Sequence, residues 1–451
     1  MLCDQHNSKK CPARLKYEID ENNLKKNFSV TKKHNHDKPD VYFLIRQFKN
    51  EFKQQIMTTS TKPSIIYTNL CLRFPDGAAL VPFSSMISTI NNWRRQVRPP
   101  QPKSLNEYVS FLQMDRWKNY LSRNKSKLQV HYINSSDKSS AVVFADKDFL
   151  RTIRTTHLLV DATYEVCPRA PKEIYQLLTI MAVVERNTLP IAWALMTSKT
   201  KKSYTDIFNY FKTELAPHLN INKVISDFEL GIMGAVRSSY VHAQPQGCNF
   251  HFIQAIIRRT ITEKLDSLIE EREDIRVFIR KLLGLAFLPA DDIEKAFLLL
   301  VNQHKEIIQP LKGLIDYFRS YWLKIVKPER FSCYRNKNRT NNYIESYHRI
   351  LRLKLGSHPP IWEFTERIAA LQELAKIEKT SLEVNLEIRS AKNKKITLRY
   401  EMVEYLWDLY DNGTLNISNF LQCCNHISRT FKNENVWTST DDVNNFLMPI
   451  I

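Results

Sequence analysis

The sequence contains little glycine, and that scarcity excludes one class of binding site. Only 8 of its 451 residues are Gly, and neither a GxGxxG nor a GxxxxGK(S/T) pattern occurs. Both phosphate-binding loops depend on glycines that let the backbone approach a phosphate, so we expect no nucleotide cradle of either kind. The longest largely apolar stretch, residues 174–184, spans 11 residues, against about 20 in a membrane helix. With no signal peptide in the first residues, we expect no membrane partner.

Acidic residues are also in short supply. The chain has 66 Lys and Arg against 47 Asp and Glu, which leaves a net charge of +19 and a pI near 9.4. Two stretches, 41–104 and 321–358, each hold nine basic and two acidic residues, or +7 each (9 − 2). Such an excess favours a polyanionic partner, most often nucleic acid, although a solvated basic surface is the alternative.

The 8 cysteines are thinly spread, and a disulfide framework is not expected without a secretory signal. Four residues near the start of the chain have a spacing that suits tetrahedral zinc: Cys3, Cys11, His34 and His36. Two histidines at i and i+2 share one face of a strand, so both imidazoles can reach one ion. Alternating residues in 14–19 and 26–31 predict two short strands between the ligand pairs.

This zinc pattern has a known counterpart. Cys3, the run Cys11-Pro-Ala-Arg-Leu15 and the run His34-Asn-His36 resemble the FLYWCH zinc finger, a relative of the β-sheet DNA-binding fingers. The resemblance covers residues 1–38 and implies that Zn²⁺ and DNA bind there. The aromatic lead-in of that family is missing before Cys3, so we expect a truncated finger. A degenerate finger that no longer folds is the alternative.

After the finger the pattern becomes helical. Apolar periodicity predicts three helices, at 41–56, 65–72 and 83–93, in an arrangement like a helix-turn-helix. The basic residues that follow, Arg94, Arg95 and Arg98, are candidate DNA contacts. A structural connector with a basic face is the alternative. The run Pro99-Pro100-Gln-Pro102 indicates a stiff linker and a domain boundary.

The central segment changes to strands. Apolar runs predict strands at 157–166, 174–185 and 188–197, a helix at 203–215, a strand at 223–227 and a helix from 228. This βββαβα order is that of the ribonuclease H-like fold of the retroviral-integrase type, an α/β architecture. Because strands one and four are neighbours in that sheet, we expect Asp161 and Asp227 to face each other.

Acids inside apolar strands need a physical reason. Two buried carboxylates repel each other unless a cation lies between them, and Mg²⁺ or Mn²⁺ prefers such hard oxygen ligands. A third acid, Glu345, lies in the first turns of a predicted helix within the basic stretch 321–358. We expect that positive charge to keep Glu345 ionised and to gather a phosphate backbone. Two metal ions held by such a triad support phosphodiester chemistry.

Several short motifs follow one another in the central and later parts of the chain. They are Asp161-Ala-Thr-Tyr164, Gln176-Leu-Leu-Thr-Ile180, Leu189-Pro190, Ala194-Leu-Met196, Tyr204, Ser226-Asp227-Phe-Glu229, Cys248-Asn-Phe-His251 and Arg339-Thr-Asn-Asn-Tyr-Ile-Glu345-Ser-Tyr-His348. In this order they resemble the MULE (Mutator-like element) DDE transposases, over about residues 40–370. The resemblance implies that Asp161, Asp227 and Glu345 are the catalytic triad. It also implies a helical insertion before Glu345.

The CxxH pair, Cys248 and His251, also matches that family, where its role is less settled. The pair supplies two zinc ligands or organises DNA near the site. His242 and Cys333 are weak candidates for completing a zinc site. A buried cysteine beside a satisfied histidine is the structural alternative.

These patterns divide the chain into six regions. They are the finger (1–39), the helical DNA-binding region (40–104), the first part of the core (105–251), the helical insertion (252–335), the second part of the core with its Glu-bearing helix (336–400), and a C-terminal region of unknown role (401–451). Candidate DNA contacts near the third acid are Arg335, Lys337, Arg339, His348 and Arg349.

The sequence thus predicts a DNA transposase that cleaves and transfers strands at the ends of its element, with Mg²⁺ or Mn²⁺ in the core and Zn²⁺ in the finger. Double-stranded DNA, as terminal repeats and target, is the expected partner, with a homodimer or higher oligomer as the assembly and the nucleus as the location. The main alternative is a domesticated, transposase-derived DNA-binding regulator without transposition activity. A cellular ribonuclease H-like nuclease is a third interpretation.

Overall fold

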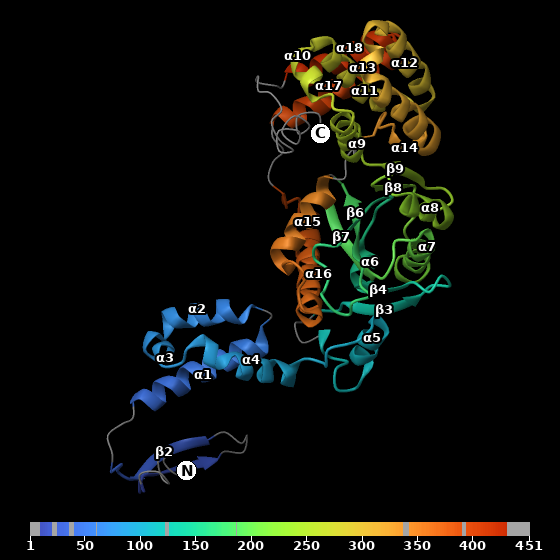
Figure 1. The fold of residues 1–451 in the computed structure, drawn as a ribbon. Helices are drawn as coiled ribbons and strands as arrows, with labels where there is room; N and C mark the ends of the chain where they lie inside the picture. The colour runs from blue at the N-terminus through green and yellow to red at the C-terminus, as the bar shows by residue number, and fades with distance from the viewer. Residues whose placement is uncertain are drawn as a thin grey trace. The chain divides into compact units, whose positions relative to one another are not determined.

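A computed structural model describes residues 10–19, 25–35, 40–59, 61–121, 126–185, 187–336, 342–389 and 394–430 (Figure 1). The chain forms two compact units, Met1–Arg98 and Pro99–Ile451, and each is described by itself. The division falls at the proline-rich segment 99–102. Within the described ranges, no helix is both long and apolar enough to cross a membrane.

The first unit begins with a hairpin. Strands β1 (Arg14–Ile19) and β2 (Lys25–Lys32) pair in an antiparallel ladder, with Arg14 opposite Lys32. The two strands expected between the cysteine and histidine segments are therefore confirmed. An isolated two-stranded hairpin buries little apolar surface, so it needs a further source of stability such as a metal ion.

Four helices follow the hairpin. They are α1 (Asp40–Thr58), α2 (Pro63–Arg73), α3 (Pro75–Ala79) and α4 (Phe83–Val97). The three helices expected from periodicity are present, and the short α3 lies between the second and third of them. The core they share includes Phe48, Phe52, Ile66, Leu70 and Ile90. Gly77 allows α3 to approach α1 closely, because a Cβ there would lie 2.8 Å from the carbonyl oxygen of Leu44.

The second unit contains one mixed sheet of seven strands in the order β3-β4-β7-β6-β5-β8-β9. The strands are β3 (Gln129–Asn134), β4 (Ser140–Ala145), β5 (His157–Thr163), β6 (Gln176–Val184), β7 (Asn187–Met196), β8 (Lys223–Ser226) and β9 (Gln244–Gly247). Strands β6 and β7 form the expected hairpin, and β8 runs parallel to β5, as expected for the first and fourth predicted strands. The fold class is therefore α/β, as expected from the sequence.

Three strands were not predicted. Strand β4 is buried along its whole length, so its sequence does not alternate between apolar and polar residues, and β3 is its antiparallel neighbour. Strand β9, with the sequence QPQG, lies at the sheet edge beside β8. Its proline and glycine argue against a strand in sequence alone, and an edge is where a sheet tolerates proline.

Helices cover both faces of the sheet (Figure 1). On one face α6 (Lys147–Thr152), α7 (Lys201–Tyr210), a π-helical turn (Phe211–Leu215) and α8 (Leu230–Ser239) pack on the sheet. On the other face lie α5 (Leu105–Gln113), α15 (Asn342–Leu355) and α16 (Ile361–Glu383). Alternate residues of each strand therefore contribute to two separate hydrophobic cores.

A separate helical cluster forms beyond β9. It contains α9 (Asn249–Thr262), α10 (Asp266–Glu271), α11 (Glu273–Gly284), α12 (Ala290–Gln303), α13 (Ile308–Tyr317), a π-helical segment (Phe318–Val326) and α14 (Pro328–Phe331). Two later helices, α17 (Lys394–Asp411) and α18 (Ile417–Thr430), pack into the same core. The indole N–H of Trp407 donates a hydrogen bond to the carbonyl of Phe287 at 2.7 Å. The region from 401 to 430 thus belongs structurally with the insertion.

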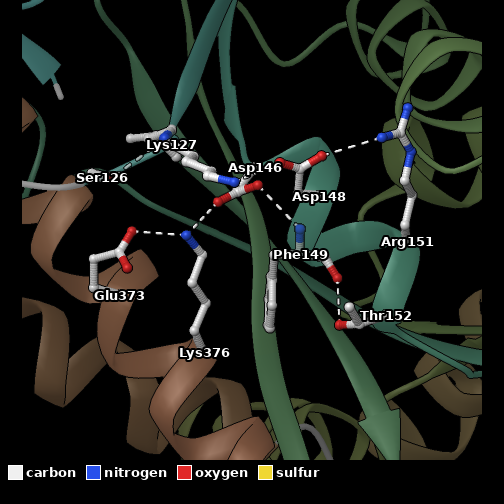
Figure 2. Close-up of polar contacts among 10 residues, drawn as sticks. Ser126, Lys127, Asp146, Asp148, Phe149, Arg151, Thr152, Glu373 and Lys376 are labelled. Atoms are coloured by element: carbon white, nitrogen blue, oxygen red, sulfur yellow. Dashed lines mark hydrogen bonds and ion pairs between the residues drawn. The ribbon is translucent and has the colours of Figure 1, made fainter.

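Helix α16 is anchored to the sheet by a buried ion pair (Figure 2). Asp146, which is 1% exposed, follows β4 and caps α6 by accepting a hydrogen bond from the backbone N–H of Phe149 at 3.1 Å. Its second carboxylate oxygen lies 2.5 Å from Nζ of Lys376 on α16, which also contacts Glu373 at 2.9 Å. One carboxylate therefore joins a strand end, a helix start and the long helix.

Candidate active site

The two aspartates point to the same face of the sheet. In β5, Leu158 and Val160 belong to one core and Leu159 belongs to the other, so Asp161, two residues further on, lies on the face of Leu159. In β8, Ile225 belongs to that second core, and Asp227 follows it two residues later. Because β5 and β8 are parallel neighbours, both acids lie near the same end of the sheet. The expected proximity follows from this pairing.

The third acid comes from the helix that covers this face. Ile344, Tyr347 and Leu351 of α15 are buried in the core of that face. Glu345 is next to Ile344 in the first turns of α15, and its side chain is 30% exposed. The same helix carries His348, whose Nδ1 atom lies 3.7 Å from Oδ2 of Asp161. Helix α15 thus brings Glu345 and His348 to the end of the sheet where Asp161 lies.

The CxxH pair lies at the junction of β9 and α9. Cys248 precedes α9 and is fully buried, and its backbone N–H donates a hydrogen bond to the carbonyl of Ser226 at 2.8 Å. His251 is in the first turn of α9, and its Nε2 atom lies 3.3 Å from Oε1 of Glu345. The pair is therefore next to the predicted triad, although 94 residues separate His251 from Glu345 (345 − 251).

Potential ligand atoms converge most closely around the CxxH pair. Across the described part of the chain, Cys248, His251 and Glu345 are the one group of three His, Cys, Asp or Glu residues whose ligand atoms all lie within 4.8 Å of one another. The predicted triad of Asp161, Asp227 and Glu345 is held less tightly. Its members are near enough for their charges to act on one another, because Asp227 and Glu345 both raise the pKa of Asp161.

Burial dominates the protonation of the acids. It raises the pKa of Asp161 well above the ordinary value, and the negative charge of Asp227 adds to the effect. Burial also raises the pKa of Glu345 to about 7. The expectation that surrounding basic residues keep Glu345 fully ionised is therefore wrong for the protein alone. The loss of water around this carboxylate outweighs the attraction of those charges, which lie largely in solvent.

The two histidines are neutral at ordinary pH. Burial, and then the neighbouring His251, lowers the pKa of His348 to about 4. Burial also lowers the pKa of His251, against the opposing attraction of Asp227. A neutral imidazole carries no charge that attracts a phosphate, and His348 lies beside Asp161. The DNA contact of His348 stays a prediction.

A relay of hydrogen bonds behind Asp227 was missed. The backbone N–H of Glu229 donates to Oδ1 of Asp227 at 3.1 Å. The hydroxyl of Tyr204 donates to Glu229 at 3.0 Å and accepts a hydrogen bond from Gln176 at 2.6 Å. Burial, and then the charge of Asp227, raises the pKa of Glu229. A second acid two residues after the strand aspartate was the available signal.

Two predicted DNA contacts have other partners. Arg94 is 8% exposed, and its guanidinium donates to the carbonyl of Thr61 at 2.6 Å, which indicates a structural role in the helical region. Arg335 is exposed and forms ion pairs with Asp408 at 2.7 Å and Asp411 at 2.5 Å. Its charge is therefore largely compensated by α17. The other predicted cations are either outside the described residues or at least partly accessible: Lys337 and Arg339 belong to the first group, and Arg95, Arg98 and Arg349 to the second.

Half of the predicted zinc ligands of the finger can be placed. The Sγ atom of Cys11 lies 3.3 Å from Nδ1 of His34, on either side of the β1–β2 hairpin in sequence. Cys3 and His36 lie outside the described residues. The hairpin thus brings one cysteine and one histidine together, as the ligand spacing requires.

Comparison with known proteins gives one family. No curated protein matches the chain significantly. The family match covers residues 157–255, which include Asp161, Asp227 and the CxxH pair but not Glu345. It indicates a transposase-related function, for which DNA is the partner. Residues 157–255 of this chain match the MULE transposase domain.

Proposed function

We propose that this protein is a DDE transposase with a ribonuclease H-like core, and that Asp161, Asp227 and Glu345 carry out metal-dependent cleavage and transfer of DNA strands at the ends of an element. The observation that supports this most is the convergence of three acids from β5, the end of β8 and α15. Burial and repulsion by the charge of Asp227 raise the pKa of Asp161. A bound cation would offset this repulsion and favour the ionised carboxylate.

The donor set suits Mg²⁺ or Mn²⁺. Asp161, Asp227 and Glu345 offer carboxylate oxygens, the hard ligands that both ions prefer. Oε1 of Glu345 is buried and accepts no hydrogen bond among the described residues. When bound, such ions make a water or a 3′-hydroxyl nucleophilic and stabilise the leaving oxygen. The three carboxylates would hold the ions on the face of the sheet that α15 covers.

The neighbouring residues orient the acids. Glu229 fixes Oδ1 of Asp227 through its backbone N–H, and the Tyr204–Gln176 hydrogen bonds hold Glu229 in turn. Neutral His348 lies beside Asp161 without carrying a positive charge that would compete with a metal ion. We assign these residues a positioning role, because hydrogen bonds around a metal-binding carboxylate set its orientation.

Other parts of the chain serve DNA in this proposal. The finger would bind Zn²⁺ through Cys11 and His34 together with Cys3 and His36, and would dock on duplex DNA. The exposed Arg95 and Arg349 would contact phosphates. Cutting two element ends together requires at least two active sites, so a homodimer or higher oligomer acting in the nucleus fits this function.

The test uses the full-length protein and DNA carrying both ends of the element that encodes it. With Mg²⁺ or Mn²⁺ we expect strand cleavage at the element ends, measured on denaturing gels. Asp161→Asn and Glu345→Gln should abolish cleavage while DNA binding persists, because both remove a metal ligand and leave the basic surface intact. Asp148→Asn removes an exposed carboxylate and serves as the matched control, with cleavage retained.

Two outcomes contradict the proposal. Cleavage that survives in Asp161→Asn would show that this acid is not catalytic. Tight binding of the element ends without any cleavage by the wild-type protein would instead support the domesticated DNA-binding regulator.

A further inference from the structure

We infer that Cys248, His251 and Glu345 form a second metal site, which takes a borderline or soft divalent ion such as Zn²⁺ and shares Glu345 with the proposed carboxylate site. Their ligand atoms all lie within 4.8 Å of one another. From sequence the CxxH pair offers two ligands, and a protein zinc site needs at least three. The fold supplies the third from α15, which follows the whole helical cluster in sequence.

The separation of the His251 and Glu345 ligand atoms fits one shared ion. Nε2 of His251 lies 3.3 Å from Oε1 of Glu345, yet this carboxylate oxygen accepts no hydrogen bond among the described residues. Two ligands at about 2.0–2.1 Å from a tetrahedral Zn²⁺ are about 3.3–3.4 Å apart. The two side chains are therefore already spaced as ligands of one ion.

The donor set selects the class of metal. A thiolate, an imidazole and a carboxylate together suit Zn²⁺ or Co²⁺, whereas Mg²⁺ rarely accepts sulfur or nitrogen ligands. Three protein ligands leave a fourth position open for water or for a group on DNA.

The surroundings hold the CxxH pair rigidly. The backbone N–H of Cys248 donates a hydrogen bond to the carbonyl of Ser226 on β8, and Gly247 packs directly against the ring of Phe228. Phe228 in turn contacts Trp322 of the helical cluster in an edge-to-face arrangement, with ring centroids 4.7 Å apart. An ion bound here would join the start of α9 to α15. It would also engage the same carboxylate that the proposed catalytic site uses.

The experiment measures Co²⁺ binding by the full-length protein without DNA, so that it does not depend on transposase activity. All variants carry Cys11→Ser, which removes a ligand of the finger. After chelation, Co²⁺ is titrated while the thiolate-to-cobalt charge-transfer absorption is recorded. We expect about one ion per chain with a thiolate band, because Cys248 is a ligand.

Cys248→Ser should remove the thiolate band and weaken Co²⁺ binding by at least about 10-fold, since even indirect changes at metal sites have effects of that size. Cys333→Ser replaces an equally buried cysteine outside the site and should keep both the thiolate band and the Co²⁺ affinity. Glu345→Gln should keep the thiolate band and weaken Co²⁺ binding by at least about 10-fold. Unlike Cys248→Ser, this substitution does not alter a fully buried residue.

A thiolate band that persists in Cys248→Ser, or that is lost equally in Cys333→Ser, overturns the inference. If Cys248→Ser does not fold, Glu345→Gln decides alone, and unchanged Co²⁺ affinity in that variant overturns the site. Absence of DNA cleavage by the wild-type protein, with Co²⁺ binding intact, would count against the proposed function and leave this site standing.

Discussion

Glu345 is the residue at which the opposing forces of this site are clearest. It lies in a basic stretch of sequence, but its side chain is largely buried between α15 and α9. Burial raises its pKa to about 7, so it gains a proton in the very range in which a metal ligand must be ionised. Without a metal, this carboxylate costs the folded state free energy at neutral pH.

Glu345→Gln should therefore stabilise the metal-free protein in a pH-dependent way. Because the folded-state pKa is raised, the folded protein binds more protons than the unfolded chain between about pH 4.5 and 7, and wild-type stability falls as pH rises through this window. Glutamine removes that dependence. We expect a gain of about 1–3 kcal/mol at pH 8 and almost none at pH 4.5. Urea unfolding with chelator at both pH values measures the difference, and an equal effect at both would contradict the burial argument.

At this scale the sequence indicates residue types better than their environments. Asp161 and Asp227 could be identified as candidate metal ligands from the sequence, because acids within apolar strands need a partner. The inward orientation of His348 and the burial of Arg94 could not be predicted, because they depend on which helix face packs against the rest of the fold. Glu229 belongs to a motif seen in the sequence, but its role could not be inferred, because that role comes from hydrogen bonds to Tyr204 and Asp227 that only the fold creates.

At the scale of secondary-structure elements, the junctions that follow β8 and β9 position the site. Asp227 and Phe228 follow β8, Gly247 ends β9, and Cys248 follows it. A Cβ at Gly247 would overlap the ring of Phe228, so the segment after β8 packs directly against the end of β9 at this glycine. The chain uses few glycines, and this one is required by close packing.

Gly247→Ala should destabilise the protein by about 1–3 kcal/mol, because the added methyl group forces Phe228 away from its place next to Asp227. We expect Mn²⁺ binding to weaken with it. Gly234→Ala, on α8, is the matched control: its Cβ would meet only the flexible chain of Lys201, and alanine favours a helix. Thermal unfolding compares the two, and equal stability of both variants would rule out this packing argument.

The anchor of α16 gives a second prediction for the elements (Figure 2). Asp146→Asn keeps a side chain that caps α6 but removes the charge that pairs with Lys376. We expect a loss of about 1–3 kcal/mol in unfolding free energy, below the usual cost of breaking a fully buried pair because Lys376 is 27% exposed. Asp146→Ala should cost about 1 kcal/mol more through loss of the cap.

The control for this pair is Asp148→Asn, since Asp148 forms only exposed ion pairs with Lys127 and Arg151. Urea unfolding should show no measurable change for it. If Asp146→Asn behaves like Asp148→Asn, the ion pair does not hold α16 to the sheet.

The elements themselves were largely predictable. Strands β5 to β8 and helix α7 follow from apolar periodicity, and so do most helices of the insertion. Strands β3 and β4, the proline-containing β9 and the packing of α17 and α18 on the insertion were not. Complete burial hides alternation in β4, and the partner of an amphipathic helix is set by tertiary contacts that no local pattern encodes.

For the whole molecule, fewer of the basic residues behind the net charge of +19 are free to contact DNA than the sequence indicates. Arg94 is buried within the helical region, and Arg335 is paired with two aspartates of α17. Arg349, in contrast, is exposed on α15, the helix that carries Glu345. The charges available to a phosphate backbone are therefore a subset of those counted in sequence.

Arg349→Ala should lower DNA affinity and reduce the magnitude of the salt-dependence slope by about 1, because one phosphate contact is lost. Arg335→Ala should leave the slope unchanged, since its charge is already compensated. Fluorescence anisotropy with duplex DNA at several salt concentrations measures both. A smaller slope for Arg335→Ala than for Arg349→Ala would reverse this assignment.

In the proposed function, acids from three distant segments form one hard-metal site on this fold. Mn²⁺ binding by the full-length protein, followed by electron paramagnetic resonance, tests it most directly. We predict that Asp227→Asn loses most of the Mn²⁺ bound by the wild-type protein while Asp148→Asn keeps it, because Asp227 belongs to the triad and Asp148 is an exposed surface acid. Unchanged Mn²⁺ affinity and stoichiometry in Asp227→Asn would show that Asp227 does not bind the metal.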